Sequence, residues 1–213
     1  MGLGKLRVFN DDTLVPGAAW PMHPHRDIEG LTYVAEGTFE HADSRGNGGI
    51  LPPGSVQRAT LGSGMEHSER NGSKTEPMRF IQMWIIPARR GLEPSIDQRS
   101  FSAESRRNVL KPVLLPADGY ATEGAPRAED AVHVHQDAAV YAGLLDAGAT
   151  VTHRMRDGFL GYFFVVHGAV DLAADGEKVG PIEERGAAKV LSAKELTIAT
   201  RPGAEVLLVE VPR

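Results

Sequence analysis

The feature that most constrains the fold is a pattern that the chain carries twice. Tyr-Val-x-x-Gly-x-x-Glu at residues 33–40 matches Phe-Val-x-x-Gly-x-x-Asp at residues 164–171. An apolar run that ends in proline follows each copy, at residues 81–87 and 206–212. The glycine and the closing proline lie 50 positions apart in the first copy and 44 in the second. Such self-similarity predicts two copies of one structural unit of similar size.

The residues within and between these copies are typical of short strands joined by tight turns. The 24 glycines and 14 prolines make up about 18% of the 213 residues, against roughly 12% in an average protein. This excess favours an all-β chain of two antiparallel jelly-roll barrels. We expect the first barrel at residues 1–95, a crossover at 96–131 and the second barrel at 132–213. The predicted strands are 5–10, 28–35, 38–42, 55–61, 78–87, 132–135, 139–145, 150–155, 160–166, 169–173, 189–191, 195–199 and 205–211, and we expect turns at 11–13 and 16–17.

Two pairs of candidate metal ligands lie in the first half. His23 and His25 form one pair, and His67 and Glu69 form the other. Both pairs are spaced i, i+2, so each can point two donor atoms to one face of a strand. A single His-x-His is a weak signal, since such histidines are often ordinary hydrogen-bonding residues. The second pair raises the odds, and three imidazoles with one carboxylate predict a mononuclear site with open coordination positions.

The second half has no matching set of ligands. At the positions that correspond to His23 and His25, counted back from the repeated glycine, stand Arg154 and Arg156. His153 is one residue out of phase and should face the other way. We therefore expect a second barrel without a metal. His133 and His135 have the right spacing but no downstream partner, so we interpret them as structural, like His41 and His167.

Several motifs together resemble the pirin family of two-barrel cupins (bicupins). His-Pro-His-Arg-Asp-x-Glu-x-x-Thr-Tyr-x-x-Glu-Gly fills residues 23–37, and Gly-Ser-Gly-x-x-His-Ser-Glu fills residues 62–69. Further matches lie at residues 4–12, 40–47, 98–101 and 134–137. The resemblance implies that His23, His25, His67 and Glu69 hold one divalent metal, with iron expected first and manganese, nickel, cobalt, copper or zinc as alternatives. Pirins commonly have an extra stretch before this first motif, so we expect an alternative start or a first barrel that lacks one strand.

Three functions are compatible with such a site. The resemblance implies a quercetin 2,3-dioxygenase, which opens a flavonol ring with O2, with Glu69 as a metal ligand or as the general base for the substrate hydroxyl. The alternative is a non-enzymatic, metal- and redox-dependent regulator that binds protein partners. A weaker third reading is another cupin reaction, such as sugar isomerisation. Glu29 follows the first histidine pair, and we expect it to support the site or the fold. Arg26 and Asp27 could form an ion pair that braces the histidine strand, or both could be solvated.

Composition excludes other classes of protein. A net charge of −5 argues against binding of nucleic acid through phosphate contacts. The chain has no cysteine, so any metal must be bound by nitrogen and oxygen. The absence of cysteine also fits a reducing compartment. There is no apolar run of the roughly 18 residues that a transmembrane helix needs, and no signal-peptide pattern. We therefore predict a cytoplasmic protein that does not contact membranes.

Overall fold

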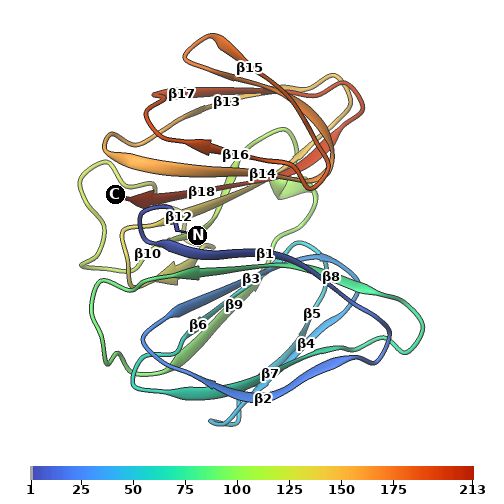
Figure 1. The fold of residues 1–213 in the computed structure, drawn as a ribbon, viewed down its shortest axis with the longest axis vertical. Coiled ribbons are helices and arrows are strands. Elements are labelled where there is room, and N and C mark those ends of the chain that lie inside the picture. Colours follow the sequence, from blue (N-terminus) through green and yellow to red (C-terminus); the bar gives the residue numbers. More distant parts are fainter. Residues whose placement is uncertain (1) are drawn as a thin grey trace. The chain divides into compact units, whose positions relative to one another are not determined.

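The computed structural model describes residues 2–213, and strands make up nearly all of its regular structure (Figure 1). Two compact units are present. Unit 1 contains residues 2–101, 117–120 and 132–136, and unit 2 contains residues 102–116, 121–131 and 137–213. The residues of the expected crossover, 96–131, belong partly to unit 1 and partly to unit 2. The domain boundaries expected from the sequence stay a prediction.

Unit 1 is built from two antiparallel sheets. The five-stranded sheet has the order β1-β8-β3-β6-β9, and the four-stranded sheet has the order β2-β7-β4-β5. In Figure 1, β2 and β7 run side by side, and these two strands carry the histidines predicted to bind metal. The strands of the unit are β1 (Leu6–Leu14), β2 (Ala19–His25), β3 (Glu29–Glu36), β4 (Phe39–Asp43), β5 (Gly48–Leu51), β6 (Ser55–Thr60), β7 (Met65–Asn71), β8 (Met78–Ile85), β9 (Ser95–Ser100) and β11 (Val132–Val134).

Unit 2 is organised around one long strand, β14. Its ladder runs β10-β12-β18-β14-β17-β13, and β15 and β16 also pair with β14. The elements of the unit are the 3-10 helix η1 (Glu104–Arg106) and strands β10 (Lys111–Pro116), β12 (Ala139–Leu145), β13 (Thr150–Arg154), β14 (Phe159–Ala174), β15 (Glu177–Glu183), β16 (Ala187–Val190), β17 (Glu195–Ala199) and β18 (Ala204–Pro212).

The two units have the same connectivity. In one sheet, the order β12-β18-β14-β16 of unit 2 corresponds to β1-β8-β3-β6 of unit 1. In the other, the order β13-β17-β14-β15 corresponds to β2-β7-β4-β5. The first part of β14 takes the place of β3, and its last part takes the place of β4. The duplication that the sequence predicts is therefore confirmed. The predicted break between residues 166 and 169 is wrong, because Gly168 pairs with Ala204 and keeps the ladder continuous.

The repeated glycine of each unit has the same role. Gly37 and Gly168 have φ values of +77° and +78°, in the left-handed region that favours glycine. A Cβ on Gly37 would lie 2.5 Å from the carbonyl oxygen of Pro77, and one on Gly168 would collide with the carbonyl of Gly203. Pro77 and Gly203 each precede the last long strand of their unit. The tight approach of two backbones explains why both copies of the pattern contain glycine.

The first strand extends further than the sequence predicts. β1 continues to Leu14, whereas we expected a turn at residues 11–13. Asp11 receives hydrogen bonds of 2.8 and 2.9 Å from the guanidinium of Arg79, a side chain with 2% exposure. This buried pair offsets the poor strand propensity of aspartate, since an unpaired buried arginine would be costly. The turn at residues 16–17 is present.

Each unit has its own hydrophobic core. In unit 1, one cluster forms around Phe39 and Phe80, and a smaller one around Leu61 and Met65. The smaller cluster lies at the start of β7, so packed side chains fix the end of the strand that carries His67. In unit 2 the buried residues form one larger cluster.

Candidate metal centre

Two neighbouring strands carry all four predicted ligands. β2 holds His23 and His25, and β7 holds His67 and Glu69. The strands pair antiparallel with His23 directly opposite His67, so both side chains lie on one face. The ring centroids are 4.6 Å apart for His23–His67, 4.9 Å for His23–His25 and 5.4 Å for His25–His67. One ligand nitrogen from each ring lies within 4.8 Å of the others, so the structure brings the three histidines together.

The backbone beside His23 selects which of its nitrogens is free. Nδ1 lies 2.8 Å from the carbonyl oxygen of Pro21. A carbonyl can only accept, so Nδ1 carries the proton and donates it, and Nε2 keeps its lone pair. Ligating histidines usually donate their second N–H to a carbonyl or carboxylate in this way. The Pro21 carbonyl therefore leaves Nε2 of His23 free to bind a metal.

His67 is the buried member of the group. The residue is 5% exposed, and neither ring nitrogen has a hydrogen-bond partner among residues 2–213. Burial, reinforced by the nearby histidines, lowers its pKa to about 3. The imidazole is thus neutral, which is the form that binds a metal. An unpaired buried nitrogen costs about 1–3 kcal/mol, and a coordinated cation would remove that cost.

Glu69 lies beside the histidines but is held by another residue. Its carboxylate, 2% exposed, accepts hydrogen bonds of 3.1 Å at both oxygens from the amide nitrogen of Gln82. The Gln82 oxygen in turn accepts a 3.2 Å bond from the indole N–H of Trp84. Burial raises the pKa of Glu69 to about 7, although the bond from Gln82 opposes this and nearby Asp12 adds to it. Glu69 is not in the close group of donor atoms, so its role as a ligand stays a prediction.

A small cavity beside these side chains has the size of an ion. It has a volume of about 10 Å³ and is lined by His25, His67, Glu69 and Gln82 among others, but not by His23. This is roughly the volume that one water molecule or ion needs. Three nitrogen donors and a nearby carboxylate oxygen form a set that suits mid-row divalent metals. The residues present therefore fit a single metal ion.

Comparison with known proteins assigns the chain to a family. The sequence pattern described as Pirin matches residues 1–85, and that of the quercetinase C-terminal cupin domain matches residues 124–211. The chain belongs to the pirin family. The resemblance and the fold of two cupin barrels that the sequence predicts are thereby confirmed.

Several relatives of this pirin match over nearly its whole length. A protein named quercetin 2,3-dioxygenase from Escherichia coli K12 is 35% identical over 100% of this chain and 84% of its own length. A pirin-like protein from Caulobacter vibrioides is 34% identical over 99% of this chain and 84% of its own. The crystal structure of the bacterial pirin YhhW from Escherichia coli in complex with nickel(II) superposes with a TM-score of 0.84, at 33% identity, over 100% of this chain and 84% of that one. Together with the histidine cluster, these findings indicate a divalent metal in this pirin.

Other candidate residues of the sequence have structural partners. Glu29 is fully buried and accepts a 2.8 Å hydrogen bond from Nδ1 of His135 and a 2.9 Å bond from the hydroxyl of Thr60. It supports the fold of unit 1, which is one of the two roles that the sequence predicts for it. The suggested pair of Arg26 and Asp27 is wrong: Arg26 donates to the Ser63 carbonyl, and Asp27 accepts from the amide of Gly91.

The arginines of the second copy lie outside any histidine cluster found among residues 2–213. Arg156 donates to Glu210 at 3.0 Å and to Asp137 at 2.6 Å. His153 contacts the same fully buried Glu210 at 3.0 Å. Burial would raise the pKa of Glu210, but the bonds from His153 and Arg156 outweigh it and lower that pKa.

Several residues around the site are not predicted from the sequence. Gln82 and Trp84 belong to an apolar run that we interpreted only as a buried strand, although their i, i+2 spacing could have indicated a shared face. Asp12 was missed because the first predicted strand ends at residue 10, and Asn10, the last residue of that strand, gave no signal of its own. Within residues 2–213, no helix is long and apolar enough to cross a bilayer.

Proposed function

We propose that this pirin is a metal-dependent flavonol 2,3-dioxygenase of the quercetin 2,3-dioxygenase type. The observation that carries the proposal is the convergence of His23, His25 and His67 beside the buried carboxylate of Glu69. The name of the relative from Escherichia coli K12 supports the same reaction. The substrates are a flavonol and O2.

His23 through Nε2, together with His25, His67 and Glu69, would hold one divalent transition metal. We propose iron first, and nickel is the ion bound in the related YhhW structure. When bound, such an ion supplies Lewis acidity that lowers the pKa of the flavonol 3-hydroxyl, and it supplies a redox-active centre for dioxygen. A mixed nitrogen and oxygen ligand set keeps manganese, cobalt, copper and zinc as alternatives.

Glu69 is the proposed acceptor for the proton of the 3-hydroxyl. Its carboxylate is buried next to the histidines, and Gln82 holds both oxygens in a fixed plane. Trp84 in turn fixes the Gln82 amide, since the indole N–H can only donate and so selects the amide oxygen. A positioned carboxylate near the reacting hydroxyl is what general base catalysis requires.

The overall reaction balances with O2 as the only co-substrate. Two carbon–carbon bonds of the central ring break, both oxygen atoms of O2 enter the products, and the carbon between the broken bonds leaves as carbon monoxide. The remaining product is an ester that joins one aromatic carboxylic acid to the phenolic hydroxyl of a second aromatic acid. The chain's own contribution is to orient the flavonol and to exclude bulk water from the buried carboxylate.

The test is turnover by the metal-loaded protein in air. We expect quercetin and O2 to be consumed one to one, with release of carbon monoxide, and both to stop in the His67→Ala variant. His41→Ala is the matched control, because His41 is also a buried histidine but is not part of the close triad. A protein that binds metal through the triad yet consumes neither substrate would refute the proposal and favour the regulatory alternative that acts through protein partners.

A further inference from the structure

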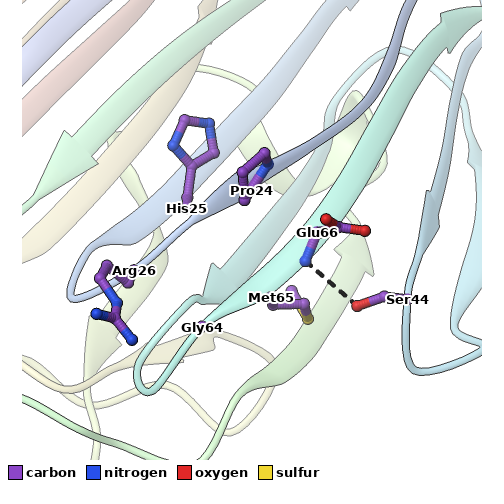
Figure 2. A pocket seen from close by; sticks show the side chains of 7 residues that line it. All are labelled: Pro24, His25, Arg26, Ser44, Gly64, Met65 and Glu66. Carbon is purple, nitrogen blue, oxygen red and sulfur yellow. Dashed lines mark hydrogen bonds between the residues drawn. The ribbon is translucent and has the colours of Figure 1, made fainter.

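Two open cavities flank the metal centre, and both reach His25. The larger one, of about 660 Å³, is named here the Arg26 cavity and is drawn in Figure 2. Its other lining residues are Pro24, Arg26, Ser44, Gly64, Met65 and Glu66. The smaller one, of about 410 Å³, is named the tryptophan cavity, and it is lined by Asn10, Asp12, Trp20, Pro21, His23, Glu69, Gln82 and Trp84 besides His25. Both volumes are within the range of about 300–1,000 Å³ that small-molecule sites have.

Access to the metal centre distinguishes the two cavities. The tryptophan cavity exposes His23, His25 and Glu69, three of the four predicted ligands. Of the four predicted ligands, the Arg26 cavity exposes His25 alone. Figure 2 shows the guanidinium of Arg26 pointing away from the His25 ring. A substrate that must reach both the metal and Glu69 therefore fits the tryptophan cavity better.

The walls of the tryptophan cavity suit a flat aromatic molecule. Both tryptophans of the chain, Trp20 and Trp84, line it. Each ring is held by an edge-to-face contact, Trp20 with Phe80 at 5.5 Å and Trp84 with His25 at 4.9 Å. Pre-oriented aromatic rings bind another ring without first having to be ordered. The Arg26 cavity has no tryptophan, tyrosine or phenylalanine among its lining residues.

One wall of the tryptophan cavity carries polar groups that the fold does not use. Asn10 and Asp12 are two apart on β1, and Asn10 is paired with Gln82 across the ladder, so all three side chains share a face. The side chains of Asn10 and Asp12 make no hydrogen bond within residues 2–213. Asp11, between them, faces the other way and binds Arg79. The wall thus presents a carboxylate and an amide to whatever enters the cavity.

We propose that the tryptophan cavity is the substrate site, and that Asp12 and Asn10 select flavonols whose outer ring carries hydroxyl groups. The phenolic O–H groups would donate to the Asp12 carboxylate and the Asn10 amide oxygen, while Trp20 and Trp84 hold the ring. Carboxylate acceptors form stronger hydrogen bonds than neutral ones, so Asp12 provides most of the selection. This inference rests on the proposed function and names the residues that determine its specificity.

The experiment compares quercetin with galangin, the flavonol that lacks both hydroxyls of the quercetin catechol ring. Because one hydrogen bond to a charged group is lost, Asp12→Ala should lower the quercetin-to-galangin ratio of kcat/KM about tenfold or more. Asp12→Asn and Asn10→Ala should give smaller decreases. The ratio is the readout because Asp12 also acts on Glu69, an effect common to both substrates. Glu66→Ala is the matched control, since Glu66 lines the other cavity.

A binding measurement separates this inference from the reaction. Nickel-loaded protein without O2 is titrated with each flavonol, and quenching of tryptophan fluorescence gives Kd. A lower preference for quercetin in Asp12→Ala, with no change in Glu66→Ala, supports the inference even if neither flavonol is turned over, which would refute only the proposed function. An unchanged preference in a folded Asp12→Ala and Asp12→Asn protein, or a change caused by Glu66→Ala, would overturn the inference.

Discussion

Replacement of His67 by leucine should separate metal binding from stability. In the metal-free protein, a neutral His67 ring leaves one donor and one acceptor nitrogen buried and unpaired. Each such group costs about 1–3 kcal/mol, and an apolar side chain of similar size does not have that cost. After allowance for imperfect packing of leucine, we expect metal-free His67→Leu to be about 1–3 kcal/mol more stable than the wild type.

Addition of metal should reverse this order. An ion that binds only the folded protein stabilises it by about 2.7 kcal/mol when its concentration is 100 times Kd. Wild-type protein should gain that amount, and His67→Leu should gain little of it. Thermal unfolding with a chelator and with nickel measures both effects, at about 2–4 °C in Tm for each kcal/mol in a chain of this size.

His41→Leu is the control that tests the reasoning. His41 is 4% exposed, and both its ring nitrogens are also unpaired among the described residues, but it is outside the close triad. We therefore expect the same gain in metal-free stability together with an undiminished response to nickel. The reasoning is refuted if His67→Leu still responds to nickel like the wild type, or if the metal-free variant loses several kcal/mol.

Three further predictions concern the supports of the site and the fold. Gln82→Leu removes both hydrogen bonds to Glu69, so metal affinity measured by calorimetry should fall about 10–100-fold, and unchanged affinity would contradict the role given to Gln82. Gly37→Ala should lower the free energy of unfolding in urea by about 1–3 kcal/mol or more, because its Cβ meets a backbone carbonyl. Gly17→Ala, at a φ of +70° with open space around it, should lower it less. The pKa of Glu210 is lower in the folded protein than its ordinary value of 4.5, so its ionised form stabilises the fold at pH values above 4.5. This stability is lost as the pH falls through the pKa that Glu210 has in the folded protein. Glu210→Gln should therefore destabilise the protein at neutral pH, by about 3–5 kcal/mol for a broken buried pair, and the difference from wild type should shrink in acid.

Local spacing was sufficient to predict which ligands face the same way. The i, i+2 separation of His23 and His25 places two imidazoles on one side of a strand in any sheet. The pairing of His23 with His67 depends on the register of β2 against β7, which a sequence pattern does not fix. The family motif supplied that link, because it contains both pairs. The proposed place of Glu69 in the ligand set comes from its i, i+2 spacing with His67 and from the same motif.

The errors came from residues whose partners are distant in sequence. Asp11 and Asp12 have low strand propensity, and Arg79, which makes a strand favourable there, lies 68 positions away. Glu29 is no error, but which of its two expected roles it has was left open because its partner His135 is 106 positions away. Gln82 lies in an apolar run, and its polar side chain is not part of a periodic pattern there. Contacts of this range decide polar networks, and local patterns cannot anticipate them.

The two units show how one connectivity can support different polar interiors. His25 lies twelve positions before Gly37, and Arg156 lies twelve before Gly168. A neutral imidazole at this position offers a lone pair to a cation from solution, whereas a guanidinium is itself a permanent cation that only donates hydrogen bonds. Arg156 accordingly joins the buried carboxylates Glu210 and Asp137. Arg156 lies beyond the end of β13, so the equal offset from glycine is a feature of the sequence and not of the shared ladder. In unit 1 the positive charge would come from a bound ion, and in unit 2 it comes from the chain.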